Sequence, residues 1–395
     1  MPESGFSKYI RRADYKTQDI YIDSNDATAV GDILRPLGSR RIYIICSSAN
    51  LKYKAVRDVI SALKDQGFPS FVYSMLGDRC SSTDIVTAFK QFWDYNCNTV
   101  ISIGNDEDCC LAKMTAAMAA CRGKELKDLK GINKVRGTVP VLCHIPMDNG
   151  TGGSSAYAHF YDDEEGRIEY VVSSLLLPKI VLIDTDLSLH IPMAESVDSS
   201  LCSLAMAVDC YADRDGVQYP EYRADAENAC LSFVGNLEKM KANPGDAYLR
   251  RNVNVAALYA GMATRRIGAG VSNVTADVVR SVTGKMSGAH CLAITAHMLE
   301  EDTDSFAHPM STLAKAAYLC PANTDDDNGV TTFIEYLRRL CYKNQGDSGA
   351  GAFSETEAGK CADEIRRIMG DVFGRKVSPQ KIARILMTVQ PAGNS

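Results

Sequence analysis

The sequence predicts an α/β domain with a Rossmann-like parallel sheet, followed by an all-helical domain. Apolar runs alternate with amphipathic helical segments from Arg41 onward. This alternation is typical of strand–helix–strand units, which form a parallel sheet with helices on both faces. After about Leu189 the helical periodicity continues almost throughout. We therefore expect one domain over residues 1–188 and a second, all-helical domain over residues 189–395.

In the first domain, the expected strands are short apolar runs that end in small or polar residues. A short strand at "DIYI" precedes the runs "RRIYIICSS", "SFVYSML", "NTVISIGND", "TVPVLCHIP" and "KIVLIDTDL". The expected helices between them are "YKAVRDVISALKDQGF", "SSTDIVTAFKQFWDYN" and "EDCCLAKMTAAMAACRG". A hairpin is expected around "HFYDDEEGRIEYVVS", because turn-forming residues separate two apolar segments.

The second domain shows helical spacing of its apolar residues. The clearest expected helices are "MAESVDSSLCSLAMAVDCYAD", "AENACLSFVGNLEKMKAN", "LRRNVNVAALYAGMATRRIGA" and "AHCLAITAHMLEED". Another helix is expected within "GAGVSNVTADVVRSVTGKMSG". Ligands of such two-domain chains bind at the carboxyl ends of the strands and in the cleft between the domains, so we expect a small-molecule ligand there.

Composition limits the function. The chain has 395 residues, of which 46% are hydrophobic and 23% charged, with a net charge of −6. These values favour a globular protein that does not bind nucleic acid. We find no apolar run long enough to span a membrane and no export signal, so we expect a cytoplasmic protein. Its fourteen cysteines lack metal-binding spacing and are expected to be reduced thiols.

A strand ends at Gly104, and the next helix begins with Asn105 and three acidic residues. A dinucleotide-binding fold places the pyrophosphate at such a helix N-terminus. Those loops are usually rich in glycine, whereas the carboxylates here repel a phosphate. The segment therefore has two interpretations, a weakened cofactor-binding loop around Gly104 and Asn105 or a plain acidic helix start.

A second loop, "DNGTGGSS", follows the strand that ends at Pro146. Its Gly150, Thr151 and Gly152 provide flexible backbone amides and a hydroxyl, which could hold a phosphate or a cofactor ring. A turn that leads into the hairpin is the alternative, because clusters of glycine and serine commonly form such turns.

Several segments together resemble the iron-containing, group III alcohol dehydrogenases, whose fold is similar to that of dehydroquinate synthase. The resemblance covers roughly Arg41 to Asp302. The family's strand–GGGS–helix–Lys stretch matches "SIGNDEDCCLAK", and its "IPTTAGTGSE" loop matches "IPMDNGTGGS". Further matches are "LLPKIVLIDTDL", the helix "CSLAMAVDCY" and the ungapped stretch "SNVTAD…MSG". The resemblance implies an NAD(P)-dependent oxidation of alcohols assisted by a divalent metal.

The departures from the family fall on its metal ligands. One Asp and three His hold the family's metal, and the matching positions here are Cys202, Met206, Asn273 and Ser287. A further active-site His corresponds to Asp277. Divalent ions of this kind prefer carboxylate and imidazole ligands, so we expect no divalent metal. In the nucleotide loops, Asp148 replaces a threonine, so NAD(P) binding is expected to be weakened.

Three hypotheses follow from these observations. The first is a pseudoenzyme without the metal-dependent redox site, acting as a binding or regulatory subunit in a homodimer or with an active homologue. The second is a metal-independent NAD(P)-linked oxidoreductase acting on a small alcohol, aldehyde or ketone in the interdomain cleft. Its thiolate or acid–base groups would be Cys202, Asp277, Ser287 and His290. The third is an ordinary metal-dependent dehydrogenase whose ligands lie elsewhere in the chain.

Overall fold

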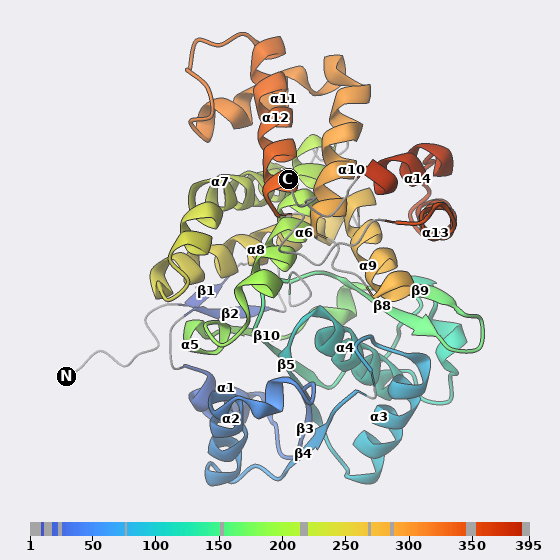
Figure 1. The fold of residues 1–395 in the computed structure, drawn as a ribbon. Helices are drawn as coiled ribbons and strands as arrows, with labels where there is room; N and C mark the ends of the chain where they lie inside the picture. The colour runs from blue at the N-terminus through green and yellow to red at the C-terminus, as the bar shows by residue number, and fades with distance from the viewer. Residues whose placement is uncertain are drawn as a thin grey trace, which may run out of the picture. The chain divides into compact units, whose positions relative to one another are not determined.

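We describe the protein from a computed structural model. It describes residues 9–11, 18–22, 26–75, 77–150, 154–213, 220–267, 270–284, 288–344 and 353–388. The chain forms two compact units, residues 1–191 and residues 192–395. Figure 1 shows an α/β arrangement in the first unit and helices in the second. The predicted fold class is therefore confirmed.

The first unit is built on a parallel sheet. Among the described residues, seven strands pair in the order β1-β2-β10-β7-β5-β3-β4. Only β1 is antiparallel to its neighbour, and the other pairs are parallel. The strands are β1 (Tyr9–Arg11), β2 (Asp19–Ile22), β3 (Ile42–Ile45), β4 (Ser70–Tyr73), β5 (Thr99–Gly104), β7 (Val141–Pro146) and β10 (Ile180–Ile183). The sequence runs predict all of these except β1.

Helices cover both faces of this sheet, because its strands are apolar on both sides. They are α1 (Val30–Leu34), α2 (Lys54–Asp65), α3 (Ser82–Asp94), α4 (Asp106–Ala120) and α5 (Thr185–Ser188). Along β5, Val100 packs into the cluster formed with α3 and α4, whereas Ile101 packs into the cluster formed with α1 and α2. Residues 107–119 of α4 are all buried, so this helix lies inside the unit.

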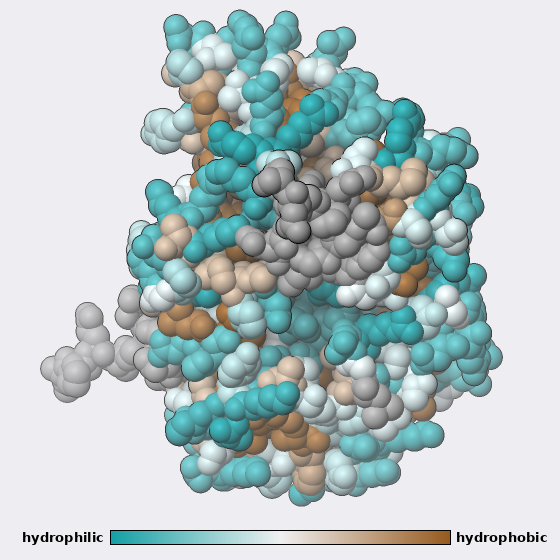
Figure 2. All heavy atoms as spheres, in the orientation of Figure 1, coloured by the Kyte–Doolittle hydropathy of each residue, from teal (hydrophilic) through white to brown (hydrophobic). Residues whose placement is uncertain are grey.

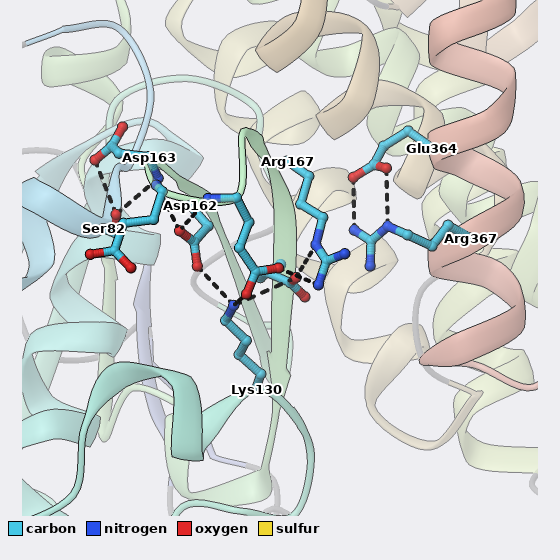
Figure 3. Close-up of polar contacts among 10 residues, drawn as sticks. Ser82, Lys130, Asp162, Asp163, Arg167, Glu364 and Arg367 are labelled. Carbon is cyan, nitrogen blue, oxygen red and sulfur yellow. Dashed lines mark hydrogen bonds and ion pairs between the residues drawn. The ribbon is translucent and has the colours of Figure 1, made fainter.

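A small second sheet contains the predicted hairpin. Its strands are β6 (Gly131–Ile132), β8 (Tyr157–Asp162) and β9 (Arg167–Val172), in the order β6-β9-β8. The Lys130 ammonium lies 2.7 Å from an Asp162 carboxylate oxygen, beside the turn (Figure 3). The Asp163 carboxylate accepts hydrogen bonds from the Ser82 hydroxyl and the Thr83 amide, both at 3.0 Å. These contacts tie the hairpin to the start of α3.

The second unit consists of helices around a long central helix, α6. The helices are α6 (Met193–Ala212), α7 (Pro220–Ala242), α8 (Ala247–Ile267), α9 (Val271–Thr283), α10 (Gly288–Glu301), α11 (Thr303–Ala316), α12 (Asp326–Asn344), α13 (Glu355–Asp371) and α14 (Pro379–Thr388). Apolar residues of α6, α7, α8, α10, α11 and α12 form one continuous core. The predicted helices are present, although α7 begins at Pro220, six residues before its predicted start at Ala226.

The surface agrees with a globular protein. Hydrophilic side chains cover most of the face drawn in Figure 2, and hydrophobic side chains form small patches. None of the helices in the described ranges is long and apolar enough to cross a membrane.

Candidate functional site

The first candidate site lies at the carboxyl ends of β5 and β7, which pair in register from Thr99 to Gly104. Gly104 ends β5 where the backbone passes very close to the Asp108 side chain. A Cβ at this position would lie 1.8 Å from an Asp108 carboxylate oxygen, so a side chain cannot be accommodated without rearrangement. The glycine is therefore needed for the strand-to-helix turn itself, whether or not a phosphate binds there.

The N-terminus of α4 is capped from within the chain. The Asn105 side-chain oxygen accepts hydrogen bonds from the amides of Glu107 and Asp108, at 3.1 and 3.2 Å. The Asp108 carboxylate accepts in return from the Asn105 amide at 3.3 Å, which completes a capping box. These amides are among the donors that a pyrophosphate would use at a helix N-terminus. Here the protein's own side chains already occupy them.

Three carboxylates surround this helix start. A Cβ on Gly150 would lie within 2.7 Å of the Asp106 carboxylate, so the second loop lies directly against that group. The Asp148 carboxylate accepts a hydrogen bond from the Gly150 amide at 3.1 Å. The structure thus brings together Gly104, Asn105, Asp148 and Gly150 from the two loops. Thr151 and Gly152 lie outside the described residues.

Asp108 is fully buried at the centre of this group. Burial raises the pKa of its carboxyl to about 8, and the nearby charges of Asp148 and Glu107 also raise it. Hydrogen bonds from the backbone of Asn105 and Ser47 act in the opposite direction. The acidic side chains of Asp106 and Asp148 lie beside this group, next to Gly150. The residues present therefore do not fit a pyrophosphate bound as in glycine-rich loops.

The end of the second loop, at Ser155, contacts a buried side chain of α4. The fully buried Lys113 ammonium donates to the carbonyl and hydroxyl oxygens of Ser155, both at 3.0 Å, and to the Tyr157 carbonyl at 2.9 Å. The Ser155 hydroxyl, at the end of the "DNGTGGSS" segment, is therefore bonded to a side chain of α4. These bonds satisfy a charge that would be costly to bury alone.

The second candidate site lies in the helical unit, where α6, α9 and α10 pack together. Cys202 on α6 and Cys291 on α10 bring their sulfur atoms to 3.9 Å. Cys202 is partly exposed, whereas Cys291 is buried. Burial raises the pKa of the Cys291 thiol well above its ordinary value, and the charges of Cys202, Asp198 and Asp277 add to this effect. The Cys202 thiol and the Asp277 carboxylate therefore both act on the Cys291 thiol.

The other positions that match metal ligands have different surroundings. The Asn273 amide donates to the Asp277 carboxylate at 3.1 Å, one turn further along α9. Met206 is buried in the helical core, one turn beyond Cys202. Ser287 lies outside the described residues. His290 is fully buried, and its ring packs edge-on against Phe353 with the centroids 4.7 Å apart.

Two carboxylates of α6 contact the first turns of α9 and α10. Asp198 accepts a hydrogen bond from the Gly288 amide at 2.7 Å. A Cβ on Gly288 would lie 2.5 Å from the Asp198 carbonyl oxygen, so only glycine allows this close approach. Asp209 accepts from the Ser272 amide at 3.0 Å, at the start of α9. Each carboxylate interacts favourably with the positive end of the helix dipole at the N-terminus that it contacts.

The donor atoms do not fit the divalent metal that the resemblance implies. Such an ion is held by about four carboxylate, imidazole or thiolate ligands. Here a thiol faces a second thiol, and an amide is bonded to the carboxylate beside it. Within the described ranges, no group of three or more His, Cys, Asp and Glu side chains could hold a metal ion.

Sequence reasoning missed two polar contacts. The contact of Cys291 with Cys202 has no signal in the sequence, because the two residues are 89 positions apart. In the first unit, His159 lies 3.1 Å from the Glu107 carboxylate and 3.6 Å from the Cys110 sulfur. All three side chains are buried and join α4 to β8. The sequence signal for this pair is that Glu107 and His159 each lie in an otherwise apolar segment.

Comparison with known proteins shows which family the first unit resembles. Residues 17–185 match the model of the family described as iron-containing alcohol dehydrogenase. The matched residues all lie in the first unit. The chain is therefore similar to the iron-containing alcohol dehydrogenases over this unit.

Individual relatives are distant. The chain is 22% identical to the NAD-dependent methanol dehydrogenase of Bacillus methanolicus, over 71% of this chain and 74% of that protein. It is 23% identical to a 1-propanol dehydrogenase of Citrobacter freundii, over 78% and 81% of the two chains. The solved structure of a 1,3-propanediol oxidoreductase superposes with a TM-score of 0.85 at 19% identity, over 94% and 97% of the chains. An alcohol dehydrogenase from Oenococcus oeni gives 0.82 at 18% identity, over 94% and 97%.

Proposed function

We propose that this protein is a family member without the metal-dependent oxidation of alcohols, and that it acts as a binding or regulatory subunit. The observation that carries the proposal is the donor set on α6 and α9. Cys202, Met206 and Asn273 stand at three of the four positions that match the family's ligands, and Asn273 bonds to Asp277. Thioether and amide groups are poor ligands for iron or zinc.

The nucleotide end supports the same proposal. The α4 amides are capped by Asn105, and Asp106 and Asp148 place negative charge beside them. At the start of α4 we propose no more than a weak NAD(P) site. A homodimer or a complex with an active relative, and a cytoplasmic location, remain predictions from the sequence.

The test combines metal analysis with a ligand-restoring variant. The purified chain is incubated with Fe²⁺ or Zn²⁺ and desalted, and its metal content and NAD(P)⁺-dependent oxidation of 1-propanol are measured. We expect little bound metal and no turnover. The variant Cys202→Asp, Met206→His, Asn273→His and Ser287→His is expected to take up close to one ion per chain, because it restores the family's ligands. One tightly bound iron or zinc with turnover in the unmodified chain would refute the proposal.

A second candidate function is a metal-independent NAD(P)-linked reductase. It is favoured by one observation, that Cys202 and Asp277 are both partly exposed and both act on the Cys291 thiol. A thiol and a carboxylate there could act as acid and base. The test is NADPH-dependent reduction of small aldehydes in the presence of a metal chelator. Activity that falls in both Cys202→Ser and Asp277→Asn, without a loss of secondary structure, would favour this candidate over the first.

A further inference from the structure

Arg250 is a buried cation without an ionic partner. It lies in the first turn of α8 and is 2% exposed. Its Nη1 atom donates a hydrogen bond to the hydroxyl of Ser196, which lies in the first turn of α6. The buried Nε atom has no hydrogen-bond partner, and no carboxylate among the described residues forms an ion pair with this guanidinium. Because buried charges in proteins are usually paired, these surroundings favour an anion.

The two helix starts at this contact add to the positive potential. A helix N-terminus carries the positive end of the helix dipole, and two of them meet where Arg250 contacts Ser196. Pro192 precedes α6 without a capping side chain. The acidic residues at these helix starts, Glu195 and Asp246, are both exposed. Burial lowers the pKa of the Arg250 guanidinium, and no neighbouring charge in the described part of the chain opposes this shift.

We propose that Arg250 binds a small carboxylate anion at the starts of α6 and α8. Since Nη1 is engaged by Ser196, the opposite edge of the guanidinium, with Nε and Nη2, is available to a ligand. The parallel N–H groups of such an edge match the two oxygens of a carboxylate. A monoanion balances the single positive charge. The low exposure of Arg250 limits the ligand to a small anion such as formate.

This proposal goes beyond the proposed function, because it concerns an anion and holds whether or not the chain oxidises alcohols. Arg250 and Ser196 are not among the positions that match the family's metal ligands or nucleotide loops. The hydrogen bond between them joins α8 to α6 in the folded helical unit. An anion that binds this folded arrangement, and not the unfolded chain, stabilises the unit in proportion to its concentration.

The experiment is urea denaturation of the full-length chain in increasing sodium formate, followed by circular dichroism. Sodium chloride keeps the ionic strength constant. Above the dissociation constant, each tenfold increase in formate should lower the unfolding equilibrium constant of the unmodified chain about tenfold. Arg250→Met should show no formate dependence, and it should still fold, because an apolar side chain removes the cost of an unpaired buried charge. Arg251→Met removes the same charge at the next, more exposed position and should keep the full dependence.

Arg250→Lys covers the case in which Arg250→Met fails to fold. Lysine keeps the charge but lacks the parallel N–H groups, so formate should bind at least about tenfold more weakly. The proposal is overturned if the unmodified chain shows no formate dependence, which includes the case in which chloride binds equally well. An equal dependence in Arg250→Lys, or a loss of dependence in Arg251→Met, overturns it too. Iron uptake with alcohol oxidation refutes only the proposed function.

Discussion

Asp108→Asn should make the stability of the first unit much less dependent on pH. Burial raises the pKa of Asp108 from its ordinary 3.8 to about 8 in the folded protein. The folded state therefore favours the neutral acid, and the free energy of unfolding falls as the pH rises from about 4 to about 8. For these two pKa values the loss between pH 5 and pH 9 is about 4 kcal/mol. Asparagine resembles the neutral acid and has no such titration.

The measurement is urea denaturation between pH 5 and pH 9, followed by tryptophan fluorescence. The only tryptophan, Trp93, lies on α3 in the same unit and reports its unfolding. We expect the free energy of unfolding of Asp108→Asn to exceed that of the unmodified chain by an amount that increases with pH. Asp106→Asn removes a charge from the same helical turn and controls for charge number alone. If Asp108→Asn and the unmodified chain lose stability in parallel across this range, the reasoning is wrong.

Substitutions at three further positions test packing and polar contacts by urea denaturation, followed by circular dichroism for the helical unit and by Trp93 fluorescence for the first unit. Gly288→Ala should destabilise the helical unit by about 1–3 kcal/mol, because its Cβ would overlap the Asp198 carbonyl; unchanged stability would show that α10 can move away. Asp163→Ala should cost about 0.5–2 kcal/mol, since it removes the acceptor for the Thr83 amide at the start of α3, and Asp163→Asn should recover part of that loss. Lys113→Met should cost about 1–3 kcal/mol by leaving buried oxygens without their donor, and a neutral result would mean that water replaces the ammonium.

The sequence predicts most of the fold, because the signals for strands and helices are local. The run from Ile42 to Ile45 is apolar at every position, and the structure places it inside the parallel sheet, between β5 and the edge strand β4. The sequence does not predict β1, because a strand of three residues is too short to show an alternating or apolar pattern. The complete burial of α4 was also missed. In the sequence, the charged residues Glu107 and Lys113 indicate a solvent-exposed helix face. Their buried partners are 42 to 52 residues away, so no local pattern reveals them.

The candidate sites were predictable only in part. Helical spacing places Asn273 one turn from Asp277, and the structure joins them by a hydrogen bond. The resemblance to a family indicated Cys202 but not Cys291, because the family's motif does not include that position. A contact between α6 and α10 depends on how the helices pack, and no local pattern in the sequence encodes it.

The placement of Asp198 and Asp209 has a consequence for the order in which the helical unit can open. The N-cap residue of α9 is Gly270, which has no capping side chain, and α6 supplies the acceptor for the Ser272 amide of α9. α6 likewise supplies the acceptor for the first amide of α10. The amides at the starts of α9 and α10 therefore both donate to side chains of α6. Their starting turns are expected to exchange amide hydrogens at the rate at which α6 detaches, as one cooperative group.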